Sequence, residues 1–172
     1  DVKPWTWVGN ITTFNEDAWT ALGVTLSPDA TYYFQVRAID NVNLEGAPAE
    51  VAIVVDTARP VLSNGSPTGY IGNASPTISA DFLDVGVGLD ASETVLTLTY
   101  IGSATTITSG FTGTPSYANG DLNTTIEYTP IAPLSGDGEY TVDMVAYDLA
   151  GNKSTPDDTL QWTFRLDTTP PE

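Results

Sequence analysis

The chain has 172 residues, of which 22 are acidic and 5 are basic, so its formal net charge is -17 at pH 7. It contains no cysteine and no histidine, which excludes thiol nucleophiles, Ser-His pairs and the usual zinc sites. So acidic a surface repels phosphate backbones and anionic membranes, and no apolar run is long enough to span a bilayer. We therefore expect no nucleic acid and no membrane insertion, and regard divalent cations as the better partners.

Apolar and polar residues alternate in short runs that are bounded by Gly, Pro, Asn and Asp, and no window keeps a helical period. The predicted fold class is therefore all-β. In chain order, strands are expected at 32–40, 51–57, an irregular stretch near 61–71, 76–83, 93–101, 104–108, 122–129, 139–147 and 159–166. The seven or so strands of the second half are typical of a β-sandwich.

Two of these runs repeat one another at a spacing of 108 residues, from 32 to 140. Their matching faces carry Tyr32, Phe34, Val36 and Ala38 in the first run and Tyr140, Val142, Met144 and Ala146 in the second. A strand that ends in Asp56-Thr57 likewise matches one that ends in Asp167-Thr168, and a proline follows each pair. Such self-similarity indicates an internal repeat of about 110 residues.

The repeat length predicts the domain organisation. Only about 57 residues precede the first linker, which is about half of one repeat. We predict the C-terminal half of one domain over 1–57, a complete domain over 58–168, and the start of a linker to a following domain over 169–172.

A family resemblance rests on the corner that precedes each matching strand. Leu26-Ser27-Pro28 and the alternating run after it resemble the E–F corner and F strand of fibronectin type III domains. The segments 134–146, 148–154 and 167–171 resemble the bacterial Ig-like repeats of large surface proteins and adhesins. The resemblance implies tandem immunoglobulin-like (fibronectin type III-like) β-sandwiches, the first incomplete at its N-terminus, in an extracellular or cell-surface protein such as an adhesin or S-layer component.

A tyrosine near the start of strand F can bury its ring while its hydroxyl bonds a backbone group upstream. Tyr32 and Tyr140 are the candidates for that role.

Aspartates gather in the loops that a sandwich of this topology turns toward the preceding domain. The loop after the second strand of the complete domain and the loop after its sixth strand both lie at that end, beside the linker. The resulting candidate ligands for a junctional Ca²⁺ are Asp56, Asp81, Asp84, Asp90 and Asp148. The alternative is that these residues cap backbone amides in ordinary turns, which suits the Asp148 segment with its Gly-Asn especially well.

The leading functional prediction is a non-catalytic structural extender, in which proline-bearing linkers restrict the joints between repeated domains. Its expected partners are neighbouring domains of the same chain, or another copy that completes the first sandwich. The alternatives are a carbohydrate-binding or other ligand-binding module, with Trp5 and Trp7 on one strand face as the sugar platform, and an accessory domain of a secreted enzyme.

Overall fold

The structure is a computed structural model that describes residues 23, 25–155 and 159–171, and these residues are built from β-strands. The strands are β1 (Ala30–Val36), β2 (Ala49–Val55), β3 (Val61–Ser66), β4 (Gly69–Ile71), β5 (Ile78–Leu83), β6 (Val95–Tyr100), β7 (Ser103–Ile107), β8 (Thr112–Thr114), β9 (Asn123–Tyr128), β10 (Gly138–Val145) and β11 (Leu160–Leu166). The all-β prediction is confirmed for this part of the chain. Among the described residues, no helix has the length and apolarity needed to cross a membrane.

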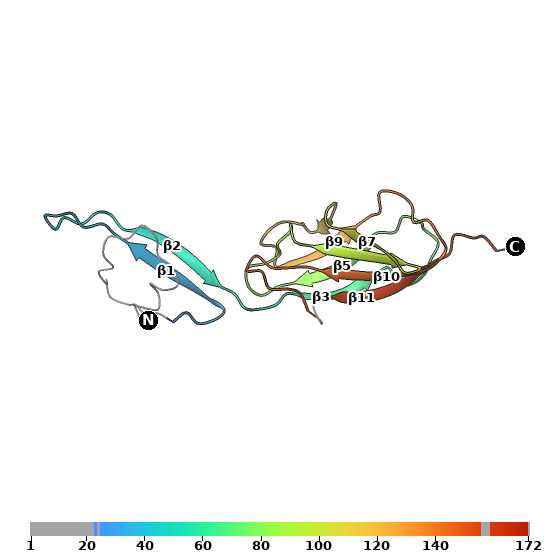
Figure 1. Ribbon diagram of the computed structural model, residues 1–172, viewed down its shortest axis with the longest axis horizontal. Coiled ribbons are helices and arrows are strands. Elements are labelled where there is room, and N and C mark those ends of the chain that lie inside the picture. Colours follow the sequence, from blue (N-terminus) through green and yellow to red (C-terminus); the bar gives the residue numbers. More distant parts are fainter. Residues whose placement is uncertain (1–22, 24, 156–158, 172) are drawn as a thin grey trace.

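The first two strands form an antiparallel hairpin, in which Ala30 pairs with Val55 and Val36 pairs with Ala49. A short linker leads from β2 into β3, so that the hairpin and the remaining strands follow one another along the long axis (Figure 1). The C-terminus lies at the opposite end from the hairpin.

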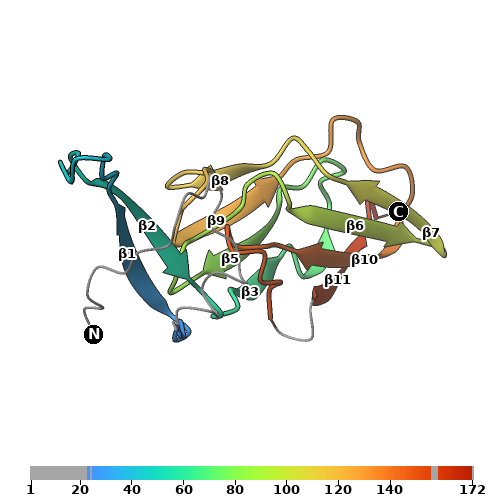
Figure 2. The same ribbon diagram turned by 60° about the vertical axis from the view of Figure 1, so that its left-hand side comes forward.

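The other nine described strands form two sheets that face each other (Figure 2). One sheet has the order β3-β5-β9-β8 and the other has the order β4-β11-β10-β6-β7. All neighbours are antiparallel except β4 and β11, which run parallel. Below, this two-sheet unit is called the sandwich.

The core of the sandwich lies between the two sheets and follows the strict alternation of β-strands. The predicted face of β10 and the residue after it is buried: Tyr140, Val142, Met144 and Ala146 are each at most 3 % exposed. They pack with inward residues of the facing sheet and of β6 and β11, among them Leu62, Ile78, Ala80, Phe82, Leu96, Ile126, Phe164 and Leu166. Burial of these apolar side chains is the main stabilising term of the sandwich.

Observed strands in the sandwich match the expected ones to within two or three residues at each end, with two differences. The irregular first strand is divided at Pro67, which has no backbone N–H for a ladder. Its two parts, β3 and β4, lie in different sheets. The short strand β8 was not predicted, because Thr112, Gly113 and Thr114 show no apolar alternation.

Tyr140 fixes the corner between β9 and β10, as the sequence predicted. Its hydroxyl donates a hydrogen bond to the backbone oxygen of Gly136 at 3.0 Å. Its ring is stacked between Tyr100 and Phe164, with centroid distances of 4.6 and 5.2 Å. In the hairpin, the hydroxyl of Tyr32 accepts a hydrogen bond from the backbone N–H of Ser27 at 2.5 Å, so both candidate tyrosines anchor the backbone upstream of their strand.

Replacing Tyr140 with Phe should lower the free energy of unfolding by about 1 to 3 kcal/mol, because the carbonyl of Gly136 loses its donor while the ring stack is kept. Tyr70→Phe is the matched control: Tyr70 is 78 % exposed, and we expect a change within about 0.5 kcal/mol. Urea unfolding followed by fluorescence measures both. Equal effects of the two substitutions would contradict the role of the Tyr140 hydroxyl.

Candidate metal centre at the linker

Three aspartates from distant parts of the sequence meet where the linker enters the sandwich. Asp56 directly follows β2, Asp84 directly follows β5, and Asp148 lies in the loop after β10. One carboxylate oxygen from each lies within 4.8 Å of the others. Because β5 and β10 both end at the linker side of the sandwich, their loops place the two aspartates beside Asp56.

All three carboxylates are largely removed from solvent: Asp148 is 1 % exposed, Asp84 4 % and Asp56 9 %. Two like charges at this separation repel each other by about 3 to 4 kcal/mol for each pair at an effective dielectric constant near 20. Burial makes this arrangement costly unless backbone amides or a cation compensate for the charge.

Backbone amides of the loop after β5 compensate for part of that charge. Asp84 Oδ2 accepts hydrogen bonds from the N–H groups of Gly86 at 3.1 Å and Gly88 at 2.7 Å. Asp56 Oδ2 accepts one from the N–H of Val87 at 2.8 Å, and its Oδ1 accepts one from the N–H of Ala58 at 2.9 Å. The linker carboxylate is therefore bonded both to its own turn and to the sandwich.

Asp148 organises the loop after β10 in the same manner. Its Oδ1 accepts hydrogen bonds from the N–H groups of Ala150 and Asn152 at 2.8 and 2.9 Å, and its Oδ2 accepts one from Asn152 Nδ2 at 2.8 Å. Asn152 Nδ2 also donates to the backbone oxygen of Asp56 at 3.1 Å. The turn function expected for Asp148 is thus observed. Sequence reasoning treated Asn152 as a turn residue and missed its contact with the linker.

One oxygen of the cluster is not explained by turn capping. Asp84 Oδ1 is buried and accepts no hydrogen bond from any described residue. A buried charged oxygen without a partner loses its hydration with no compensation, which is unfavourable by several kcal/mol. A metal ion held by Asp56, Asp84 and Asp148 would provide that compensation.

Glycine at position 86 is required by the close approach of the linker. A Cβ atom built there would lie 1.8 Å from Asp56 Oδ2, so any larger residue would push the linker carboxylate out of its place. The contact between the linker and the loop after β5 therefore depends on glycine at this position.

The other two predicted ligands lie outside this cluster. Asp81 stands on the outer face of β5, where it accepts hydrogen bonds from Asn64 Nδ2 and Thr125 Oγ1, both at 2.8 Å. These two bonds hold the pKa of Asp81 below its ordinary value. Asp90 caps its own turn, with its Oδ1 accepting from the N–H of Ser92 at 3.0 Å. Strand alternation explains why Asp81 lies apart from the cluster. Its two neighbours in β5 face the buried core, so Asp81 faces outward.

The linker is also held from both sides next to Asp56. On the hairpin side, Asp29 Oδ1 accepts hydrogen bonds from the N–H and Oγ1 of Thr57 at 2.8 and 2.9 Å. On the sandwich side, the Arg59 guanidinium donates to the backbone oxygens of Lys153 and Ser154 at 2.7 and 2.9 Å. The bonds from Thr57 hold the pKa of Asp29 below its ordinary value.

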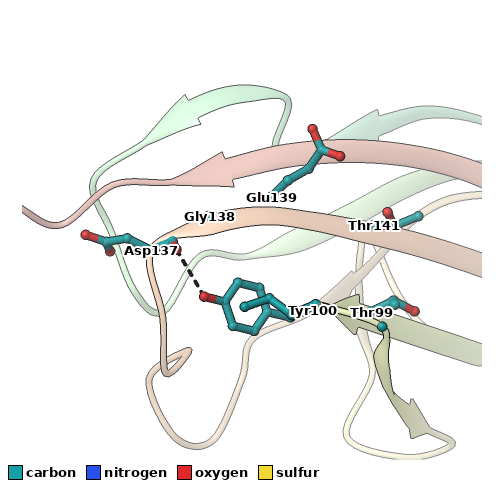
Figure 3. Close-up of a pocket in the computed structure, with 8 residues that line it drawn as sticks. Thr99, Tyr100, Asp137, Gly138, Glu139 and Thr141 are labelled. Carbon is teal, nitrogen blue, oxygen red and sulfur yellow. Dashed lines mark hydrogen bonds between the residues drawn. The ribbon is translucent and has the colours of Figure 1, made fainter.

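A shallow hollow lies at the far end of the sandwich, beside Tyr100, Asp137 and Glu139 (Figure 3). The hydroxyl of Tyr100 donates to the backbone oxygen of Asp137 at 3.0 Å. The carboxylates of Asp137 and Glu139 point in different directions, so they do not face each other across the hollow. The proposed sugar-platform residues Trp5 and Trp7 lie outside the described residues.

Comparisons with known proteins identify no family. No family model matches the chain, and no curated protein has a matching sequence. A solved structure of the archaellum periplasmic stator protein complex FlaF and FlaG from Sulfolobus acidocaldarius is 14 % identical, with a TM-score of 0.39, over 60 % of this chain and 88 % of that chain. FlaG from the same organism is 19 % identical, with a TM-score of 0.35, over 61 % of this chain and 99 % of that chain. At such scores the likeness is distant and determines neither fold nor function.

Substituting Ala for Gly86 should lower the free energy of unfolding by about 1 to 3 kcal/mol, because the new methyl group displaces the Asp56 carboxylate. Gly72→Ala is the matched control, since a Cβ there meets its nearest atom at 3.7 Å, and we expect a change within about 0.5 kcal/mol. Thermal unfolding compares the two. If Gly86→Ala left the free energy of unfolding unchanged, the close approach of the linker would not exist in solution.

Asp29 should titrate below 3.8, its ordinary pKa, and Thr57→Val should raise that pKa by removing the hydroxyl donor. Since the folded-state pKa is lowered, the contact stabilises at pH values above 3.8 and is lost as the pH falls through the lowered value. NMR titration of the side-chain carboxyl carbons measures the shift. The pKa of Asp81, which different donors lower, should not change. If the pKa of Asp29 were the same in the Thr57→Val variant, the contact between Asp29 and Thr57 would be contradicted.

Proposed function

We propose that this chain is a non-catalytic structural segment of an exported surface protein, in which a Ca²⁺ ion on Asp56, Asp84 and Asp148 fixes one domain to the next. The observation that carries the proposal is that a linker carboxylate lies close to carboxylates from two loops of the sandwich, and that all three are buried. A cation bound there contacts both the linker and the domain that follows it, so it stiffens the joint.

The strand order supports an immunoglobulin-like domain as the unit of this segment. The orders β3-β5-β9-β8 and β4-β11-β10-β6-β7 correspond to the A-B-E-D and A′-G-F-C-C′ arrangements of that fold. The tyrosine at the start of β10 and its bond to Gly136 belong to the same pattern. The antiparallel pair β1–β2 resembles the pair β10–β11 with which it aligns in sequence, which supports the proposed division at residues 1–57, 58–168 and 169–172.

Calcium suits the cluster better than other common metals. The ligand set consists only of oxygen atoms, and the chain holds no cysteine or histidine for zinc. Oxygens that surround Ca²⁺ at about 2.4 Å stand at most about 4.8 Å apart, whereas Mg²⁺ requires a tighter octahedral shell at about 2.1 Å. One oxygen from each of the three carboxylates lies within 4.8 Å of the others, so a single Ca²⁺ shell can include all three. Ca²⁺ also accepts additional carbonyl and water ligands in flexible geometry.

Two observations support the absence of catalysis. In the hollow of Figure 3, the two carboxylates that could act as an acid–base pair point apart, whereas glycosidases require theirs to flank one bond. The three clustered aspartates are buried and bonded to backbone amides, so their carboxylates are not open to a substrate from solvent. An extracellular setting agrees with the charge of -17 and with millimolar calcium, at which even a weak site is filled.

Calorimetric titration of the chain with CaCl₂ should show one ion bound, and calcium should raise the melting temperature relative to chelator. At a hundredfold excess over Kd the stabilisation amounts to about 2.7 kcal/mol. Asp84→Asn should abolish the heat and the calcium-dependent shift, yet should not destabilise the chain in chelator, since it removes a like charge. Asp81→Asn and Asp90→Asn are charge-matched controls that should keep both effects. No heat and coincident melting curves for the unaltered chain would refute the proposal.

A further inference from the structure

The C-terminal end of the sandwich repeats the contact that holds the linker to the hairpin. Asp137 Oδ1 accepts hydrogen bonds from the N–H and Oγ1 of Thr168 at 3.0 and 2.8 Å. Asp29 receives the same two bonds from Thr57. In both places an aspartate of the corner before a strand holds the threonine that follows the last strand. The same pair of hydrogen bonds therefore holds the start of the linker after the sandwich and after the hairpin.

Asp167 occupies the position of Asp56 in this second copy of the contact. Its Oδ1 accepts a hydrogen bond from the N–H two residues ahead, that of Thr169, at 3.1 Å. Asp56 Oδ1 accepts the equivalent bond from Ala58 at 2.9 Å. This bond sets the direction of the carboxylate before any partner arrives. The difference is exposure: Asp56 is covered by the loops of the sandwich, whereas Asp167 is exposed.

We infer that Asp167 and the contact around it form the donor half of a second cation-bound junction, that is, the half that supplies the linker carboxylate, and that its partner is a sandwich of the same kind placed after it in the chain. This inference rests on the proposed function. The partner contributes the acceptor half, namely two buried carboxylates equivalent to Asp84 and Asp148 in its loops. Each sandwich then has one donor end and one acceptor end, so the contact is head-to-tail and extends in one direction.

The two junctions differ in one respect that affects their strength. At the first, Arg59 adds two hydrogen bonds from the linker to the sandwich. The equivalent position in the second linker is Pro170, which has no side-chain donor. The second junction therefore depends more on the cation, although its prolines restrict the linker and reduce the entropy lost on docking.

The test extends the chain after Pro171 with a second copy of residues 61–171, so that residues 167–171 act as the linker. We expect the number of Ca²⁺ ions bound per chain to rise from one to two in calorimetric titration. Asp167→Asn in the extended chain should return the number to one, as should Asp56→Asn alone. Asp143→Asn, which removes a charge from β10 away from both linkers, should leave two.

A second extended chain, in which residues 56–60 replace residues 167–171, is the matched positive control and should also bind two ions. If this control binds two and the first extended chain binds one, Asp167 is not a donor and the inference is overturned. If both extended chains bind one, the acceptor half is not transferable and the inference is again overturned, with the proposed function intact. An unaltered chain that binds no calcium overturns the proposed function itself.

Discussion

The joint between the hairpin and the sandwich depends on one carboxylate that forms bonds in two directions. Asp56 closes its own turn through Ala58 and accepts the N–H of Val87 from the loop after β5. Its backbone oxygen accepts a hydrogen bond from Asn152 Nδ2, which lies in the loop after β10. A single linker residue therefore contacts both loops. A side chain at position 86 would collide with the Asp56 carboxylate, so only glycine fits there.

Charge gives this joint its functional significance. In a chain with a net charge of -17, three buried carboxylates repel one another, and backbone N–H groups compensate for only part of that repulsion. Asp84 Oδ1 receives no such bond from the described residues. The same arrangement that is unfavourable in isolation is well suited to bind a hard divalent cation, because the oxygens are already converged and ordered. Under the proposed function, cation binding would limit bending at the joint between the hairpin and the sandwich.

The two ends of the sandwich show how a modular chain can reuse local chemistry. Asp29 with Thr57 and Asp137 with Thr168 make the same pair of hydrogen bonds, although the surrounding residues differ. These contacts involve an aspartate, a threonine and one backbone N–H, so they need little of the tertiary environment. They orient the linker, which under the proposed function is then fixed by the cation bound to the aspartate cluster.

Elements with a local signal could be predicted from the sequence alone. Period-two alternation identified β10 and its buried face, and the corner pattern identified the hydroxyl contact of Tyr140, because both depend on neighbours in the chain. Which aspartates converge depends instead on the tertiary fold. Asp81 and Asp84 are three residues apart, yet strand alternation turns one outward and the loop path turns the other toward Asp56. The contact of Asn152 with the linker likewise joins residues 96 positions apart, and such a distance leaves no periodic signal in the sequence.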